Sequence, residues 1–178
     1  MKKSFLTLMM LTVTLSLIAS CTQRPKSSES VVTEPEQTIT DNADAGLAPD
    51  FELPDLQGNP LKLSSLRGKY VVIDFWGSWC IWCIRGFPHM KEAYAKYKDK
   101  MEILGVDCND TESKWKAAVE ENKLPWLHVY CPKDAKVTDD YGITGFPTKI
   151  VIAPDGKIYK SIVGEDPAFY TMLDELFK

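Results

Sequence analysis

The sequence predicts an α/β domain with a central mixed sheet flanked by helices. Residues 70–76, YVVIDFW, form an almost unbroken run of β-branched and aromatic side chains, which is typical of a strand buried on both faces. Strand-like and helix-like segments then alternate along the chain, and this alternation indicates parallel strands joined by helices. A late pair of strand-like segments around the turn at 154–156 adds an antiparallel edge.

The domain is expected to open with a β-hairpin. Residues 48–53 alternate polar and apolar side chains, and the Gly58-Asn59 turn separates them from the strand-like segment 61–63. A second turn at 67–69 leads into the central strand. Asp74 interrupts that strand, where an ionisable group is costly unless it has a task or a partner.

Periodicity predicts the later elements. Residues 83–98 place apolar side chains three and four positions apart, which indicates a helix, although Pro88 should kink it. The remaining expected elements are strands at 101–106, 127–130, 149–153 and 157–163 and helices at 113–122 and 167–177.

The first twenty residues have the features of an export signal. Lys2 and Lys3 precede an apolar run of about 14 residues, shorter than the roughly 20 that a membrane-spanning helix needs. We therefore expect a signal peptide at 1–20 rather than a transmembrane anchor. The segment IASC at 18–21 resembles a bacterial lipobox, in which the signal is cut before the cysteine and its sulfur is lipidated. An ordinary signal peptide followed by a chance cysteine is the alternative.

Residues 21–46 are expected to be a lipidated cysteine, Cys21, followed by a flexible tether. Residues 22–46 are rich in Ser, Thr, Glu, Asp and Pro and contain no aromatic side chain, so they bury too little apolar surface to offset the entropy of ordering. Multiple acyl chains would hold Cys21 stably at a membrane. The globular domain then occupies 47–178.

Composition limits the class of partner. The chain has 178 residues, 44% hydrophobic side chains and a net charge of -4, which suits one globular domain with extensions. Lys and Arg do not cluster, so nucleic acid is not expected as a partner. Five cysteines in an exported chain lie where disulfides persist.

Two of these cysteines, Cys80 and Cys83, lie where the central strand gives way to a helix. Cys80 should cap the helix, where unpaired N–H groups and the helix dipole favour a thiolate. Cys83, one turn later and more buried, is close enough to form a disulfide with it. Attack by or on Cys80 would give a mixed disulfide that Cys83 resolves. The pattern predicts a redox-active disulfide that needs no cofactor.

Three other uses of the Cys-x-x-Cys spacing fit less well. A structural disulfide across two residues constrains little of the unfolded chain. A zinc site needs four ligands, but the sequence has no second Cys-x-x-Cys, and His89 and His128 are isolated. Covalent haem attachment needs a histidine after the second cysteine, where Ile84 stands. No bound metal is expected.

Residues 74–83, DFWGSWCIWC, resemble the active-site segment of thioredoxin. Further segments are similar to the TlpA/ResA-like branch, which consists of membrane-tethered extracytoplasmic thioredoxins: APDF at 48–51, FP at 87–88, GFPT at 145–148, APDGK at 153–157 and an insertion at 115–130. The resemblance covers the whole domain. It implies a thioredoxin-like fold with an N-terminal β-hairpin and the αβ insertion of that branch.

The resemblance also implies a function and further site residues. Pro147 should be a cis proline facing the disulfide, with the Phe146 backbone pairing with an extended substrate, and proline makes a cis bond inexpensive. The expected activity is reduction of disulfides in exported proteins within the bacterial cell envelope, on its periplasmic side. Electrons would come from a membrane thiol-disulfide donor, and the reductive branch often serves cytochrome c maturation. We expect a monomer.

The chain departs from the family pattern at two positions. Trp82 stands before the second cysteine, where many relatives have proline, so the redox potential and the direction of electron flow do not carry over. Trp82 is either an exposed recognition surface, as Trp often is, or packed beside Trp79 or Phe146. Gly86 stands where ResA-like members have a glutamate.

Asp74 matches the aspartate that precedes the first cysteine by six residues in thioredoxins. A buried carboxylate there would take the proton that Cys83 must lose before it attacks. A carboxylate that reaches solvent at a sheet edge is the alternative.

Cys108 and Cys131 both follow predicted strands. If those strands are parallel neighbours, the two sulfurs emerge at the same edge of the sheet. A second disulfide and two free, half-buried thiols are both compatible with the sequence, and Cα separation distinguishes them.

Two other functions compete with thiol-disulfide exchange. A thiol peroxidase shares the APDF opening, but peroxidases place a Pro-x-x-x-Thr-x-x-Cys loop at the active site, and this chain has none. A copper-handling chaperone of the same fold would use a histidine and two cysteines with three residues between them, whereas only two residues lie between Cys80 and Cys83.

Overall fold

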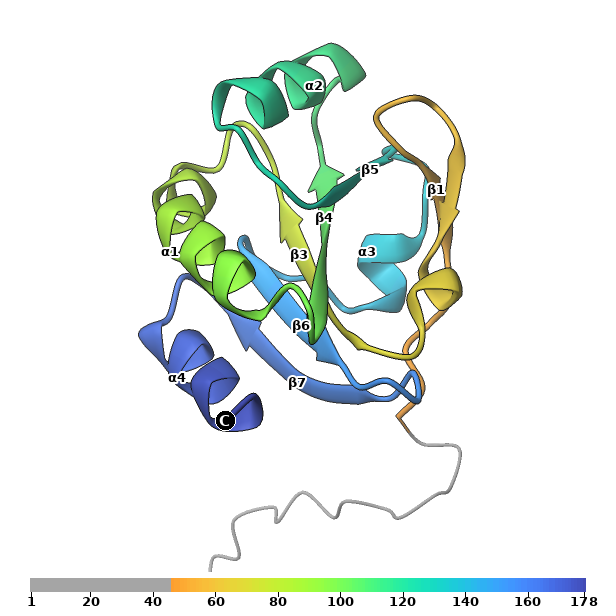
Figure 1. Cartoon of the computed structure of the whole chain (residues 1–178). Coiled ribbons are helices and arrows are strands. Elements are labelled where there is room, and N and C mark those ends of the chain that lie inside the picture. The colour runs from red at the N-terminus through yellow and green to blue at the C-terminus, as the bar shows by residue number, and fades with distance from the viewer. Residues whose placement is uncertain (1–45) are drawn as a thin grey trace, which may run out of the picture. The chain divides into compact units, whose positions relative to one another are not determined.

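The computed structural model describes residues 46–178. The expected signal peptide, Cys21 and the tether up to residue 45 lie outside the described residues. A five-stranded mixed sheet with strand order β5-β4-β3-β6-β7 forms the centre of the domain (Figure 1). The strands are β3 (Tyr70–Trp76), β4 (Met101–Cys108), β5 (Leu127–Cys131), β6 (Thr148–Ile152) and β7 (Ile158–Val163).

Helices and a small hairpin cover the two faces of this sheet (Figure 1). The helices α1 (Ile81–Tyr97) and α4 (Pro167–Leu176) lie on one face, and α2 (Glu112–Glu121) lies beyond the end of β4. On the other face lie α3 (Val137–Asp140), a 3-10 turn (Leu63–Leu66) and the hairpin of β1 (Glu52–Pro54) and β2 (Pro60–Lys62). The expected thioredoxin-like arrangement of a mixed sheet between two layers is confirmed.

The central strand β3 divides the hydrophobic core into two halves. It runs parallel to β4 and antiparallel to β6, so only one of its neighbours is parallel. Successive side chains point to opposite faces. Val72 and Trp76 therefore pack in the cluster beneath α1 and α4, and Val71 and Phe75 pack in the cluster beneath the hairpin. Asp74 points to the same face as Val72 and Trp76, because it lies two residues from each of them along the strand.

Helix α1 begins at Ile81, two residues before the predicted start. The difference arises because the Cys80 sulfur accepts a hydrogen bond from the Cys83 backbone N–H and so acts as the N-cap. Pro88 lies inside the helix. The sequence did not predict α3, because four residues are too few to show helical periodicity.

The expected insertion consists of α2 and β5, and β5 pairs in parallel with β4 at the sheet edge. Both strands extend further than predicted. Cys108 and Cys131 are therefore the last residues of their strands rather than residues that follow them, and they are direct partners in the parallel register. At the opposite edge, β7 pairs antiparallel with β6, as expected from the late turn.

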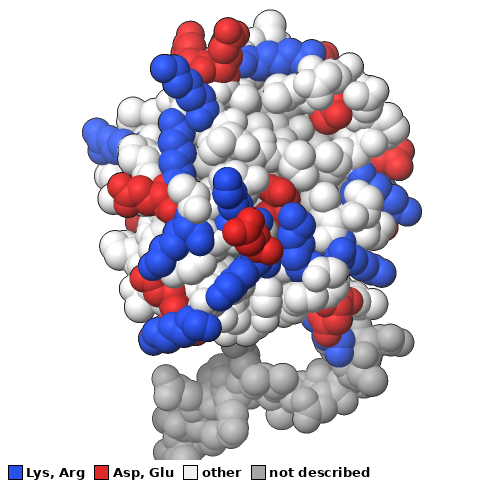
Figure 2. All heavy atoms as spheres, in the orientation of Figure 1, with Lys and Arg blue, Asp and Glu red and all other residues white. Residues whose placement is uncertain are grey.

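The surface of the domain mixes charges of both signs. On the face in Figure 2, Lys and Arg side chains are interspersed with Asp and Glu, and the upper centre is uncharged. Within residues 46–178, none of the helices is long and apolar enough to cross a bilayer.

Candidate active site

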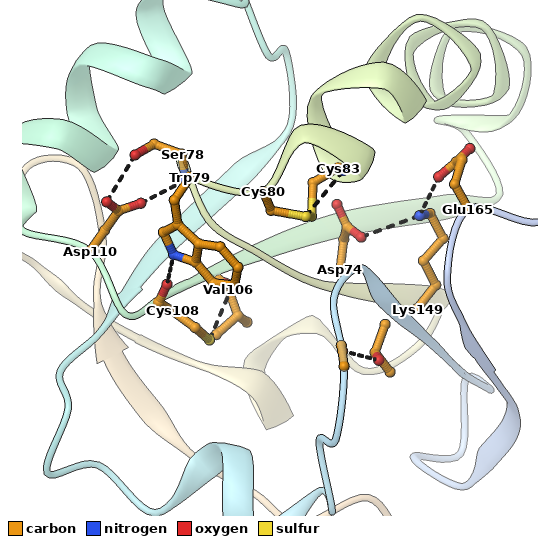
Figure 3. The surroundings of a disulfide bond; sticks show 12 residues. Asp74, Ser78, Trp79, Cys80, Cys83, Val106, Cys108, Asp110, Lys149 and Glu165 are labelled. Carbon is orange, nitrogen blue, oxygen red and sulfur yellow. Dashed lines mark hydrogen bonds and ion pairs between the residues drawn. A yellow bond between two sulfur atoms is a disulfide. The ribbon is translucent and has the colours of Figure 1, made fainter.

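Cys80 and Cys83 form a disulfide at the junction of β3 and α1, with their Cα atoms 5.3 Å apart (Figure 3). Both residues are buried, at 5% and 2% relative exposure. The Cys83 backbone N–H donates to the Cys80 sulfur at 3.2 Å. Since the dipole and the free N–H groups of a helix start favour negative charge, the geometry suits a thiolate on Cys80 when the bond is reduced.

The loop that presents Cys80 is fastened to the end of β4. The Asp110 carboxylate accepts hydrogen bonds from the Ser78 backbone N–H at 2.6 Å and from the Ser78 hydroxyl at 2.8 Å. The Trp79 indole N–H donates to the Cys108 carbonyl oxygen at 3.0 Å. Gly77 makes this approach possible, because a Cβ there would lie 2.4 Å from the Trp79 indole nitrogen. The disulfide therefore has a rigid support on one side.

Exposed aromatic side chains surround the disulfide. Trp79 and Trp82 are 51% and 58% exposed. The Trp79 ring meets Phe146 edge-on, with ring centroids 5.2 Å apart. Trp82 does not share in that contact, and the Arg85 guanidinium lies 5.0 Å from its ring centroid. Of the two alternatives for Trp82, the exposed surface is the one that the structure shows.

The Phe146–Pro147 peptide bond is cis, as the resemblance implied. Pro147 directly precedes β6, the strand that pairs with β3. The strand that carries Asp74 and the strand that starts after Pro147 are thus neighbours in the sheet.

Asp74 is buried in the middle of β3, at 2% relative exposure. The alternative of a carboxylate that reaches solvent at a sheet edge is therefore wrong. Burial raises the pKa of the Asp74 carboxyl, and the nearby Lys149 ammonium opposes that rise only in part. One oxygen of Asp74 has no hydrogen-bond partner among the described residues. These properties suit a group that binds and releases a proton.

The sequence analysis missed two charged residues beside Asp74. Lys149 is its register partner on β6, and the Lys149 Nζ lies 3.6 Å from an Asp74 oxygen. The same nitrogen lies 2.8 Å from Glu165, just before α4. Figure 3 shows Asp74 between the disulfide and Lys149, with Glu165 beyond. A lysine inside the apolar run TKIVI was the signal available in the sequence.

Glu165 also occupies the space beside Gly86 on α1. A Cβ at position 86 would lie 2.2 Å from a Glu165 carboxylate oxygen. A carboxylate from the C-terminal part of the chain thus lies in the space that a side chain at position 86 would enter.

Cys108 and Cys131 are free, buried thiols. Of the two alternatives left by the sequence, the structure shows free thiols rather than a second disulfide, although the two residues are direct neighbours across β4 and β5. The neighbouring Cys131 thiol, followed by burial, raises the pKa of Cys108.

Comparisons with known proteins agree with this site. Residues 45–161, more than half of the chain, match the model of the AhpC/TSA family. The chain belongs to this thioredoxin-like family. Similar proteins include the thiol-disulfide oxidoreductase ResA of Bacillus thuringiensis, which is 39% identical over 66% of this chain and 68% of the relative. ResA of Bacillus subtilis is 33% identical over 72% of this chain and 70% of the relative.

Among solved structures, the thioredoxin domain of a thiol-disulfide oxidoreductase from Bacteroides vulgatus is similar to this chain. It is 35% identical, with a TM-score of 0.69, and the match covers 74% of this chain and 96% of the other. With the Cys80–Cys83 pair in place, this chain is a thiol-disulfide oxidoreductase. The predicted family, fold and activity are confirmed.

Proposed function

We propose that this oxidoreductase reduces disulfides of exported proteins, with Cys80 as the attacking cysteine and Cys83 as the resolving one. The observation that carries the proposal is the buried carboxylate of Asp74 on the face of the sheet that α1 covers. In the reductive direction Cys83 must lose a proton before it attacks, and Asp74 is suited to accept it.

The reaction then has two balanced steps. The Cys80 thiolate attacks one sulfur of a substrate disulfide, forms a mixed disulfide and releases one substrate thiolate, which takes a proton from water. Cys83 passes its thiol proton to Asp74 and attacks the Cys80 sulfur. This step forms the Cys80–Cys83 bond and releases the second substrate thiolate. Two electrons pass to the substrate, and a membrane dithiol donor would restore the reduced enzyme.

Substrate would bind across the exposed aromatic surface. Trp79 and Trp82 are exposed beside the disulfide, and the partly buried Phe146 packs against Trp79. Large aromatic side chains dominate interface energetics. The Phe146 backbone, just before cis Pro147, would pair with an extended segment of the partner. Such a surface suits an unfolded or extended protein chain better than a small molecule.

The proposed location rests on the N-terminal sequence. A lipid on Cys21 would place the domain at the outer face of a bacterial membrane, in the periplasmic or an equivalent extracytoplasmic space. Cys21→Ser should release the protein from the membrane fraction without loss of thiol activity. A substituted protein that stayed membrane-bound after a salt wash would contradict the anchor.

The redox potential of the Cys80–Cys83 pair tests the direction. The reduction potential can be measured by equilibrating the protein with glutathione. If the protein is a reductant, its potential should lie near the thioredoxin value of about -270 mV, whereas a potential near the DsbA value of about -120 mV would indicate an oxidant. Asp74→Asn provides the second test. It should slow resolution by Cys83 much more than attack by Cys80, and unchanged resolution between pH 6 and 9 would leave Asp74 with a structural role only.

Three assays separate this function from its competitors. Insulin reduction should be catalysed, whereas peroxide consumption and tight copper binding by the reduced chain should be absent. The peroxide assay tests the thiol peroxidase alternative, which shares the APDF opening at 48–51.

A further inference from the structure

The cluster of Asp74, Lys149 and Glu165 contains two carboxylates and one ammonium (Figure 3). The ammonium is not shared equally. Lys149 Nζ lies 2.8 Å from Glu165 but 3.6 Å from Asp74. The first distance is that of a charge-assisted hydrogen bond, and the second is an ion pair without one. Lys149 is therefore committed to Glu165.

Burial explains why the ammonium prefers Glu165. The side chains of Asp74 and Lys149 are 3% and 2% exposed, whereas that of Glu165 is 15% exposed. Glu165 lines a groove of about 390 Å³ between α1 and α4, together with Glu92 and Tyr170. Glu165 is partly exposed to solvent and accepts a hydrogen bond from the Tyr170 hydroxyl, and both features stabilise a carboxylate. Asp74 has neither advantage.

The position of Glu165 depends on Gly86. With an alanine there, the new Cβ would collide with the Glu165 carboxylate, 2.2 Å away. Gly86 follows Cys83 by one helical turn on α1, and side chains three residues apart on a helix have Cβ atoms roughly 5–6 Å apart. Glu165 thus lies beside the same face of α1 as Cys83.

Other groups around Asp74 are less suited to set its charge. The titratable and charged groups on its side of the sheet include Cys83, Tyr94 and Tyr97 from α1, Asp107 from β4, His128 and Tyr130 from β5, Lys149 from β6, and Glu165 and Tyr170 from the C-terminal segment. Burial lowers the pKa of His128 to about 4 and raises that of Asp107 to about 9, so both are neutral near pH 7. Tyr170 is neutral there too, because burial raises its pKa.

We propose that Glu165 is a positioning residue for proton transfer at Cys83: by holding Lys149 it leaves Asp74 without a full counter-charge and so keeps Asp74 a proton acceptor. This inference rests on the proposed role of Asp74 as base. Glu165 forms its hydrogen bonds with Lys149 and Tyr170, and it acts on Asp74 through Lys149.

The direct test is the titration of the Asp74 carboxyl by carbon-13 NMR in the full-length chain labelled at aspartate, with Asp74→Asn to assign the signal. Glu165→Gln keeps an oxygen that accepts from Lys149 but removes the charge, so the whole ammonium charge acts on Asp74. The pKa of Asp74 should fall by about one unit. Lys149→Met should raise it. A merely structural role for Glu165 would not shift the pKa of Asp74 in opposite directions in these two variants.

Glu92→Gln is the matched control. Glu92 lines the same groove, and its neutralisation should leave the Asp74 titration unchanged. Gly86→Ala changes no charge, yet it should lower the pKa of Asp74 because the new methyl group displaces the Glu165 carboxylate from Lys149. Helix propensity alone would predict only a more stable helix from this substitution.

Kinetics provide the second readout. In Glu165→Gln, the pH profile for resolution of the Cys80 mixed disulfide should move to lower pH by the same shift as the titration. An Asp74 that titrates in Glu165→Gln as in the unsubstituted chain would overturn the inference. The Asp74 titration could shift as expected while the rate of resolution by Cys83 is unchanged in both Asp74→Asn and Glu165→Gln. In that case Glu165 is coupled to Asp74 as inferred, but the proposed role of Asp74 as base is wrong.

Discussion

The Trp79 indole N–H donates a 3.0 Å hydrogen bond to the Cys108 carbonyl oxygen, so the residue before the active-site disulfide is tied to the last residue of β4. The bond joins two segments that the sequence separates by 29 residues. Its acceptor is buried, because Cys108 is 2% exposed. The active-site loop and the strand end that bears the free thiol therefore form one unit.

This bond predicts the effect of Trp79→Phe. The substitution keeps an aromatic ring against Phe146 but leaves the Cys108 carbonyl without its donor, which should lower the free energy of unfolding by about 1 kcal/mol. Urea denaturation of the oxidised chain measures the change. Trp82→Phe is the control, since Trp82 is exposed and donates no hydrogen bond in the described structure. Equal losses for the two variants would contradict the role of the bond.

Cys80 and Cys83 should differ sharply when each is replaced by alanine. Cys80→Ala should abolish disulfide exchange, and Cys83→Ala should accumulate mixed disulfides through Cys80, because the helix start favours the thiolate on Cys80. Non-reducing electrophoresis with insulin as substrate distinguishes the two results. Iodoacetamide labelling of the reduced chain that favoured Cys83 over Cys80 would reverse the assignment.

Asp107 should make the protein less stable in alkali. It is fully buried, and neither of its oxygens has a hydrogen-bond partner among the described residues. Burial, followed by the charge of Asp110, raises the pKa of Asp107 to about 9. Since the unfolded carboxyl titrates near 4, the folded state binds an extra proton between the two values. Stability present below pH 4 is therefore lost progressively up to about pH 9.

The window for this measurement is pH 6.5 to 9. Burial lowers the pKa of His128 to about 4, so below about pH 6.5 the folded state binds fewer protons at His128 than the unfolded state does. In that range His128 makes stability rise with pH, which opposes the effect of Asp107. In Asp107→Asn, the free energy of unfolding should decline less steeply above pH 6.5. At pH 8.5 it should exceed that of the unsubstituted chain by about 2 kcal/mol. Urea midpoints at three pH values test this, and a variant that is less stable at all three would contradict it.

Cys108 and Cys131 should behave as two protected thiols. Both are buried, at 2% and 4% exposure, so iodoacetamide should modify neither in the folded oxidised chain. In denaturant without reductant, both peptides should become fully alkylated, which mass spectrometry detects. A peptide pair joined by a Cys108–Cys131 bond would restore the second-disulfide alternative.

The sequence alone predicted the parts of the site that depend on local order. The run at 70–76 predicted β3 to the residue, because a central strand must be apolar on both faces. The junction of that strand with a helix predicted the disulfide between Cys80 and Cys83, because the first turn of a helix is enough to bring two cysteines at this spacing together. Family resemblance supplied cis Pro147 and the aspartate at 74.

Only the tertiary structure showed which residues lie beside Asp74 and Cys108. Glu165 reaches the side of α1 only because the chain returns after β7 and Gly86 leaves room for it. Lys149 meets Asp74 because β6 pairs antiparallel with β3 in one particular register. Spacing along the chain determines which groups share a helix turn or a strand face. Contacts between distant segments depend on strand register and on the packing of α1 and α4, and neither leaves a short-range pattern in the sequence.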